Sequence, residues 1–382
     1  MELDLSSYFS ASLALMLLLF VARFIIQKTA VLLKFGIIGV YAFVILVLIR
    51  GYLPVDFSKM KLTTSYYSHN ALPFLRKIIY TEINVGRMFL SVRQILIIVL
   101  VMGWMLITYK KIYGYFVFKK FINSVPFCHN ADMIKICKDT FYTIFPSKKK
   151  YNIKIIQANI FSSPAIFVSS YPIIILPDIL YTEKELEYVF YHELIHLKHH
   201  DFLIKMAAEL MVAAYWWNPF ISKSLFGIIS QIQELYVDYE IDKELTKKER
   251  LVYLKVISKT VDHIYNDKTS RKHIYALADG HSLNMLQRVN CITSSQVNGL
   301  TLKGIIFSII LFVFSFRFVF EPSVRSTHDE LGDKVFYGSE ESSYYVWDGT
   351  NYSLYISGEC VCTTSKIHED LKNLPVYKEE LK

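Results

Sequence analysis

Four long apolar runs constrain the fold of this chain more than any other feature of its sequence. They cover residues 8–26, 31–49, 89–109 and 304–320, and each approaches the roughly 17–25 residues that a membrane-spanning helix needs. One such run on its own often forms a buried core helix. Four runs that are mostly free of interior charge and flanked by Lys or Arg predict membrane spans instead. They also explain a composition with 53% hydrophobic and 20% charged residues, which is unusual for a soluble protein.

The first run predicts a membrane anchor and not a cleaved signal peptide. Its start is acidic, with Glu2 and Asp4, and no small-residue cleavage pattern follows the run. We therefore expect residues 8–26 to stay in the membrane as the first span.

The distribution of Lys and Arg predicts the orientation of these spans. Basic residues follow the first and third runs and precede the fourth: Lys28, Lys34, Lys110, Lys111, Lys119, Lys120 and Lys303, with Arg23 near the end of the first run. Because such residues collect on the cytoplasmic side, the N-terminus is expected outside. The tail 321–382 suits the outside, with 12 acidic residues against 6 Lys and Arg. Loop 51–88 does not fit this orientation, because it would lie outside although it carries five Lys or Arg and only two acidic residues.

The sequence His192-Glu193-Leu194-Ile195-His196 carries the most specific chemistry in the chain. Positions i and i+4 of a helix lie on one face, so both imidazoles can reach one metal ion about 2.0–2.1 Å away. Glu193, one residue after the first ligand, can take a proton from a water molecule at the metal. This arrangement is typical of zinc peptidases.

The residues before this motif predict two strands and a helix start. Segments 151–157 and 165–176 are rich in β-branched and aromatic residues, which favour strands. Thr182 and Glu185 have the spacing of a capping box, so the motif helix is expected to begin near Glu183 and to run toward Asp201.

The residues after the motif predict further helices. The apolar segment 206–217 is expected to be a buried packing helix, although contact with the membrane is the alternative. Asn218 and Pro219 predict a break in the chain. An amphipathic helix is expected from about residue 222 to 245, and residues 246–302 read as helical and polar with little signal.

A catalytic zinc site needs a third protein ligand and one open position. A third His in the pattern HExxHxxGxxH is ruled out, because His199 stands in place of the Gly and Phe202 in place of the His. The alternative is a carboxylate from a later helix, and we predict Glu234, 38 residues after His196. Asp238, one turn further, is expected to accept a hydrogen bond from a ligand imidazole and fix its tautomer.

Plainer interpretations of these acidic residues stay open. In one alternative, Glu234 and Asp238 are only solvated charges on a helix face. The apolar neighbours Leu235 and Val237 argue against this alternative. Glu209 is a rival ligand, but it lies in an apolar segment too close in sequence to fold back easily.

Other polar residues carry weaker signals. Residues 199–201 form either a polar wall of the site or a hydrogen-bonded helix end. The Cys360-x-Cys362 spacing is too short for an easy disulfide, so a free pair or a bridge to another chain is open. The remaining cysteines are expected to be free thiols in the cytosolic part. They are Cys128, Cys137 and Cys291.

With these residues assembled, the chain resembles the integral-membrane zinc metallopeptidases of the β-lactam sensor-transducer, or antirepressor, family. The resemblance runs from about residue 163 to 238 and is specific in order and spacing. It rests on SPAIF at 163–167, PIIILP at 172–177, HELIHLK at 192–198 with Asp201, WNP at 217–219, and Glu234-x-x-x-Asp238. The layout of four spans with a cytosolic protease between the third and fourth is also similar.

The resemblance implies zinc bound by His192, His196 and Glu234, with Glu193 as the general base. Members of the family pass an outside signal inward, and the proteolysis that follows inactivates a DNA-bound repressor. The implied partners are the lipid bilayer, a cytosolic transcriptional repressor as substrate and an extracytoplasmic ligand or membrane partner, and a homodimer is left open. No direct nucleic-acid binding is expected, because the membrane flanks explain the net charge of +8.

The predicted fold class is α+β, a multi-span α-helical membrane protein with a cytosolic zincin-like (gluzincin) metallopeptidase domain. It has four predicted segments. They are residues 1–109, with three spans at about 8–26, 31–49 and 89–109 and an outer loop at 51–88; residues 110–302, the cytosolic zinc metallopeptidase domain; residues 303–320, the fourth span; and residues 321–382, a short acidic extracytoplasmic tail.

Two departures from the family pattern concern the strands and the tail. The family usually has Gly where this chain has Ser169 and Ser170. The β-lactam sensors end in a penicillin-binding domain with a Ser-x-x-Lys motif, whereas only 62 residues follow here from Glu321 and none of them forms that motif. We therefore expect no β-lactam sensing through such a domain. The tail is expected to be a sensor or docking piece with a small β-hairpin at 344–347 and 352–356.

Three functions follow from these patterns. The leading one is a signal-gated zinc endopeptidase that acts as a membrane signal transducer. The alternative is a constitutive quality-control or prenyl-protein-type membrane zinc protease, which would be active without an inducer. The third function is a non-enzymatic membrane receptor whose zinc site only stabilises the fold. Glu193 argues against this function, because a structural zinc site does not need that residue.

Overall fold

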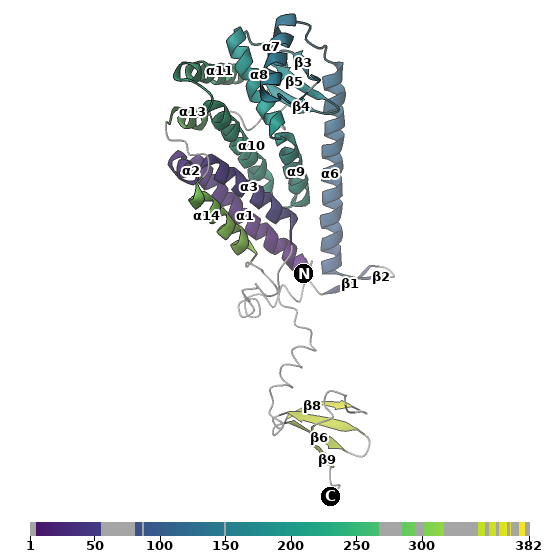
Figure 1. Cartoon of the computed structure of the whole chain (residues 1–382). Helices are drawn as coiled ribbons and strands as arrows, with labels where there is room; N and C mark the ends of the chain where they lie inside the picture. Colours follow the sequence, from purple (N-terminus) through teal and green to yellow (C-terminus); the bar gives the residue numbers. More distant parts are fainter. Residues whose placement is uncertain are drawn as a thin grey trace. The chain divides into compact units, whose positions relative to one another are not determined.

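The computed structural model describes residues 5–54, 81–85, 88–148, 150–266, 285–294, 301–316, 343–347, 351–356, 359–364, 367 and 374–378. The chain divides into two compact units, Met1–Glu321 and Pro322–Lys382, which are described separately (Figure 1). Most of the outer loop predicted at 51–88 lies outside the described residues, as do residues 317–320 of the last apolar run. The side chains of Cys360 and Cys362 also lie outside the description.

Two described helices are long and apolar enough to cross a membrane. Helix α1 (Leu5–Gln27) contains the first predicted span, and helix α6 (Val92–Ser124) contains the third. The α6 helix continues well past the predicted end at residue 109. The hairpin of β1 (Glu82–Val85) and β2 (Met88–Ser91) precedes it, and Ser91 caps its first turn through a complete capping box with Gln94.

The second apolar run differs from the prediction of one continuous span. It forms two helices, α2 (Thr29–Phe35) and α3 (Ile37–Tyr52), with an angle of 89° between them. Gly36 separates them with φ of 80°, a left-handed conformation that glycine adopts without steric cost. A third span exists only if this bent pair counts as one. The described part of the fourth run, α14 (Leu302–Ser315), has 14 residues, so four spans stay a prediction.

A small sheet lies on one side of the motif helix. Strands β3 (Lys154–Gln157), β4 (Ala165–Val168) and β5 (Pro172–Leu176) have the order β3-β5-β4, with β3 parallel and β4 antiparallel to β5. The predicted segment 165–176 is therefore two strands. They are joined by a tight turn in which the Ser169 amide donates to the Tyr171 carbonyl.

The motif helix begins where the sequence predicts. Helix α8 (Glu183–Lys198) starts after Thr182, and both hydrogen bonds of the capping box with Glu185 are present. It ends before the predicted Asp201, because His200 adopts a left-handed conformation with φ of 56° and opens the next helix, α9 (Asp201–Ala214).

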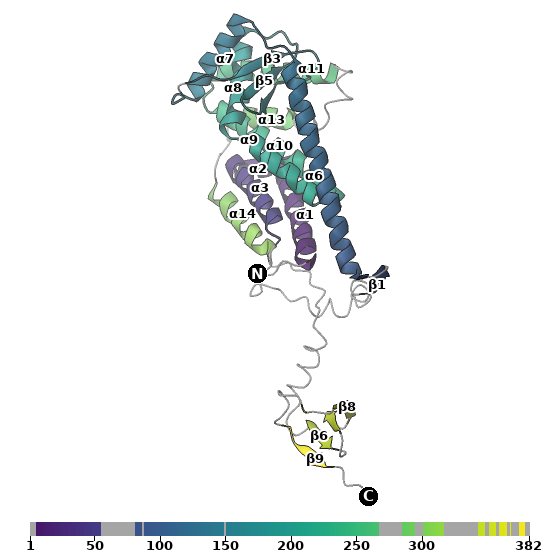
Figure 2. The ribbon, with the colours of Figure 1, turned by 90° about the vertical axis from the view of Figure 1, so that its right-hand side faces the viewer.

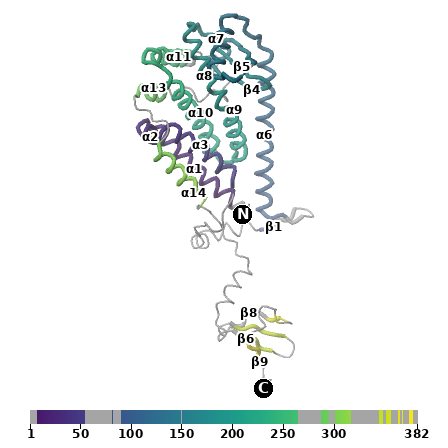
Figure 3. The backbone as a smooth tube through the Cα atoms, in the orientation of Figure 1, coloured from purple at the N-terminus to yellow at the C-terminus, as the bar shows by residue number. Residues whose placement is uncertain are grey.

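The remaining helices surround α8. Helix α10 (Pro219–Asp242) follows the predicted break, and the Asn218 side chain caps it. Helix α7 (Ala131–Ile144) precedes the sheet, and α11 (Lys247–Asn266) and α13 (Met285–Thr293) follow α10. Helix α6 runs alongside α9, as the backbone trace shows (Figure 3).

Helix α10 lies against α1 and α3, so one hydrophobic core joins the apolar helices to the helices that follow the motif (Figure 2). The buried residues of this core come from α1 and α3 and from α9 and α10, and they include Leu15, Leu19, Phe43, Val47, Met211, Ile221, Leu225 and Ile229. The predicted packing helix at 206–217 corresponds to α9, and it contacts α3. A second core joins α7, α8, the sheet, α11 and the end of α10.

The turn between α9 and α10 reaches the far ends of the apolar helices. The Tyr8 hydroxyl near the start of α1 donates to the Ala214 carbonyl at 2.5 Å. The Tyr215 hydroxyl donates to the Gly51 carbonyl near the end of α3 at 2.9 Å, and the Asn218 amide donates to Ser12 at 2.9 Å. The α9–α10 pair therefore lies along most of the length of α1 and α3.

The C-terminal unit contains a four-stranded sheet. Strands β6 (Ser343–Trp347), β7 (Tyr352–Ile356), β8 (Glu359–Thr364) and β9 (Val376–Lys378) have the order β8-β7-β6-β9. The antiparallel β6–β7 pair confirms the predicted hairpin, with Tyr345 opposite Leu354. Both of these side chains are buried, so the small sheet has an apolar side of its own.

The close approach of α14 to the bend at Gly36 generates a stability prediction. A Cβ atom on Gly304 would overlap the carbonyl oxygen of Phe35, a backbone atom that cannot easily move. Gly304→Ala should therefore destabilise the protein by about 1–3 kcal/mol. Gly114→Ala on α6 is the control, because a Cβ there meets nothing within 4 Å and should be neutral or stabilising by up to about 1 kcal/mol. Thermal unfolding of the purified protein in detergent measures both, and equal stability of the two variants would contradict the packing described.

Candidate metal centre

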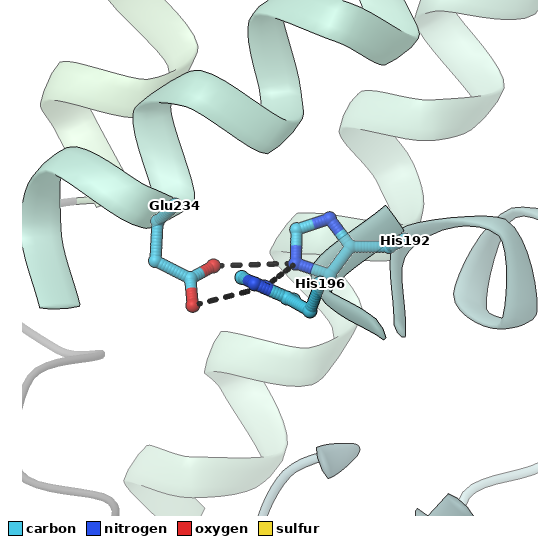
Figure 4. A group of neighbouring side chains, drawn as sticks. All are labelled: His192, His196 and Glu234. Atoms are coloured by element: carbon cyan, nitrogen blue, oxygen red, sulfur yellow. Dashed lines mark hydrogen bonds and ion pairs between the residues drawn. The ribbon is translucent and has the colours of Figure 1, made fainter. Parts of the chain in front are cut away.

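Helices α8 and α10 bring three predicted ligands together. The Nε2 atoms of His192 and His196 are 3.2 Å apart. The Glu234 carboxylate lies 3.2 Å from His192 Nε2 through one oxygen and 3.5 Å from His196 Nε2 through the other (Figure 4). Within the described part of the chain, this is the one group of three or more His, Cys, Asp or Glu side chains whose ligand atoms lie within 4.8 Å of one another.

These separations fit a metal ion in tetrahedral coordination. Ligand atoms placed 2.0–2.1 Å from such a metal lie about 3.3–3.4 Å from one another. The two histidine nitrogens are 3.2 Å apart, one Glu234 oxygen lies 3.2 Å from His192 Nε2, and the other Glu234 oxygen lies 3.5 Å from His196 Nε2, so each separation is close to this value. The side chains are 12%, 8% and 6% exposed, so little rearrangement is needed to close the site around an ion.

Hydrogen bonds on the outer side of each imidazole fix its tautomer. His196 Nδ1 lies 2.6 Å from an oxygen of Asp201, so this nitrogen donates and Nε2 is the nitrogen left to bind a metal. His192 Nδ1 lies 2.9 Å from the Tyr253 hydroxyl, which itself donates to Asp238 at 2.6 Å. The two Nε2 atoms and a carboxylate therefore face the same point, and a metal ion that displaces the proton of His196 suits such a ligand set.

Without a metal, the carboxylates around His196 favour the protonated form of its imidazole. Burial lowers the pKa of the His196 imidazole, but hydrogen bonds to Asp201 and Glu234 outweigh it and raise this pKa from 6.5 to about 10. A metal ion must displace that proton, so metal binding releases a proton and weakens as the pH falls.

Glu193 lies beside the ligands in a buried position. Burial raises the pKa of the Glu193 carboxyl above its usual range, and the nearby Glu234 carboxylate adds to this while both histidines oppose it. Glu193 lines a cavity of about 50 Å³ together with His192, Glu234 and Ser163. A water molecule occupies roughly 30 Å³ in the liquid, so this cavity has room for water beside the ligands.

Asp238 has a different contact from the one predicted. It lies 3.7 Å from His192 Nδ1, and the hydroxyl of Tyr253 on α11 lies between the two. Asp201 is the carboxylate that directly bonds the outer nitrogen of a predicted ligand, Nδ1 of His196. Burial and the neighbouring Asp238 raise the pKa of Tyr253, so its hydroxyl keeps the proton that it donates to Asp238.

Sequence reasoning missed Tyr253 and Arg288, which both line the cavity. Tyr253, Val256 and Ile257 share one helical face and are buried, and this spacing is the signal that points Tyr253 inward. The nine residues of α13 carry no comparable pattern around Arg288. Its partners lie 50 and 54 positions earlier in the chain.

The other predicted polar residues lie away from the centre. Glu209, the rival ligand, pairs with Lys111 of α6. His199 bonds Glu240 at 2.9 Å, in agreement with the helix-end interpretation for that residue. The three cysteines predicted to be free thiols are free in the structure.

The comparisons with known proteins identify a family. Residues 6–292 match the family described as BlaR1 peptidase M56, so the chain belongs to this family. The match includes the whole metal centre and extends from α1 to α13. The resemblance drawn from the motifs is therefore confirmed at the level of the family, a group of membrane metallopeptidases. A search among curated proteins finds no match to the chain.

The ligand geometry predicts one zinc ion per chain. Replacing His192, His196 or Glu234 with Ala should abolish stoichiometric zinc, since losing a ligand should cost more than the roughly 10–100-fold that losing an outer hydrogen-bond partner costs. Metal analysis of the full-length protein purified in detergent measures the ratio. His199→Ala is the control, because this imidazole bonds Glu240 outside the centre. A ligand variant that keeps full zinc would assign the role to another residue.

Proposed function

We propose that this chain is a zinc endopeptidase embedded in the membrane that converts a signal from outside the cell into proteolysis. Its family makes it a membrane-associated metallopeptidase with a place in signal transduction. The observation that carries the enzymatic part is the joint position of three ligands and the buried Glu193. The observation that carries the signalling part is the contact between an apolar helix and the carboxylate partner of His196.

The donor set favours zinc over other divalent ions. Two imidazole nitrogens and one carboxylate are a ligand set typical of catalytic zinc sites, which keep a fourth position open. Ca²⁺ and Mg²⁺ prefer more oxygen ligands than this site offers. A bound zinc ion would polarise the peptide carbonyl and make water more acidic.

Glu193 is placed to move protons during peptide hydrolysis. Burial raises the pKa of its carboxyl, which suits a group that first accepts a proton from the attacking water and then donates it to the leaving amine. Asp201 and the Tyr253–Asp238 pair hold the two imidazoles still while this happens.

Strand β4 supports an extended peptide as the substrate. It is an edge strand of its sheet and contacts α8, and Ser163 and Pro164 directly before it line the cavity beside the ligands. An extended peptide that pairs with such an edge would run toward the metal centre. The cavity of about 50 Å³ at this place has room for water beside the ligands.

A route for the signal runs through α3. Tyr41 of α3 donates a hydrogen bond to one Asp201 oxygen at 3.2 Å, and the other Asp201 oxygen bonds His196 at 2.6 Å. A movement of α3 in the membrane would therefore reach a metal ligand through two hydrogen bonds. The α9–α10 turn offers a second route, because it contacts the ends of α1 and α3 and α10 carries Glu234.

The topology and partners of the proposal follow from the charge distribution. We place the metal centre in the cytosol, a fourth span at 303–320, and the unit Pro322–Lys382 outside as the sensor or docking piece. The substrate is a cytosolic transcriptional repressor, as in the sensor-transducer family that the motifs resemble. The basic residues next to the apolar runs and the acidic tail support this arrangement.

The role of Glu193 gives the main test of the enzymatic proposal. Glu193→Gln should keep the zinc and reduce proteolysis by about 10²–10⁴-fold, because the general base is removed while the ligands remain. New protein N-termini in cells that express the wild-type chain or the variant measure cleavage, and a cytosolic DNA-binding protein should be cut by the wild type alone. Identical cleavage in both strains would refute the mechanism. Cleavage at full rate without any inducer would favour the constitutive protease.

The contact of Tyr41 gives the main test of the signalling route. Tyr41→Phe removes only the hydroxyl that bonds Asp201, and it should weaken zinc affinity by about tenfold because His196 loses part of its support. Tyr52→Phe is the control, since it removes a hydroxyl from the same helix whose acceptor is the Ala207 carbonyl. Competition with a chelator measures both affinities. Equal affinities would show that α3 does not act on the metal centre through this bond.

A further inference from the structure

Helix α13 brings a buried arginine to the metal centre. Arg288 is 12% exposed, and its Nε and one terminal nitrogen donate to the two oxygens of Asp238 at 2.6 and 2.8 Å. Its other terminal nitrogen lies 3.2 Å from the Glu234 oxygen that also faces His192. One guanidinium group therefore contacts both a predicted ligand and the carboxylate that supports another ligand.

The charges around this group explain why an arginine is needed there. Glu193, Glu234 and Asp238 are three buried carboxylates in one region, and burying such charges without a counterion is costly. The planar guanidinium presents a fork to Asp238 and a further nitrogen to Glu234, a geometry that a lysine ammonium cannot reproduce. Both carboxylates are thereby held in fixed orientations.

We propose that Arg288 is a positioning residue of the metal centre, which orients Glu234 directly and His192 through Asp238 and Tyr253. Holding Asp238 in place orients the hydroxyl of Tyr253, and this hydroxyl accepts a hydrogen bond from His192 Nδ1. His192 Nε2 then faces the metal position. The inference rests on the ligand set of the proposed function but not on the reaction that the site catalyses.

Two other roles of Arg288 make different predictions. An ion pair that only fastens α13 to α10 would affect folding stability and leave zinc affinity unchanged. A group that contacts the substrate from the cavity wall would change peptide cleavage and also leave zinc affinity unchanged. The affinity for Zn²⁺ therefore separates the positioning role from both.

The test measures the affinity of the full-length protein for Zn²⁺ by competition with a chelator, together with thermal unfolding. Arg288→Met should weaken zinc binding by about 10–100-fold, the usual effect of losing an outer partner of metal ligands. Arg288→Lys should recover part of the loss, because it restores the charge without the fork. Arg250→Met is the matched control, since Arg250 also pairs with a carboxylate of α10, Asp242, but lies outside the centre. It should leave zinc affinity unchanged.

Unchanged zinc affinity in Arg288→Met would overturn the proposal. If that variant fails to fold, Arg288→Lys and Tyr253→Phe decide instead, because Tyr253→Phe keeps the ring in the core and removes only the link between His192 and Asp238. Both should weaken zinc binding several-fold, and wild-type affinity in both would overturn the proposal. Weakened zinc in a protein that cleaves no substrate would refute the proposed function alone. Normal zinc in an Arg288 variant of an active protease would refute the positioning role alone.

Discussion

Helix α10 belongs to two hydrophobic cores, and the position of the metal centre depends on this shared packing. Ile221, Leu225 and Ile229 in its first half pack with α1 and α3. Val237 and Ile241 in its last turns pack with α7, α8 and α11. Glu234 lies near the boundary between the two groups, since Leu235 still belongs to the first core and Val237 to the second. The ligand thus occupies the junction of the apolar helices and the peptidase helices, which is why the compact unit extends from Met1 to Glu321 and has no break near residue 110.

The sequence predicts the inner part of the centre because that part is encoded locally. The i, i+4 spacing places His192 and His196 on one face whatever surrounds the helix, and the capping box sets the first residue of α8. Glu234 follows from the need for a third ligand and from the apolar residues beside it. The outer partners Tyr253 and Arg288 are different, because their roles depend on tertiary contacts with residues of other helices. The spacing of Tyr253 indicates only that its side chain points inward.

Hydropathy identifies the apolar runs but does not give their shape. A run of apolar residues at 31–49 gives the same average whether it is straight or bent, and the bend occurs at Gly36, whose positive φ glycine adopts without steric cost. The same limit applies to α6, whose extension to Ser124 adds basic and aromatic residues that lower the apolar average without ending the helix. Helix α9 is apolar for another reason, since it packs against α10, α6, α3 and α8.

Because α6 is long, a small rotation at one of its ends produces a large displacement at the other end. Its 33 residues extend over about 50 Å, which exceeds the roughly 30 Å of a bilayer core. One end carries the β1–β2 hairpin, and the other end packs through Ile122 and Phe118 against Ile156, Ile173 and Ile175 of the sheet. A tilt of about ten degrees around the hairpin end would displace the sheet end by roughly 9 Å. That displacement is nearly twice the spacing of about 4.8 Å between neighbouring strands, so a small rotation at one membrane surface becomes a large movement beside β4.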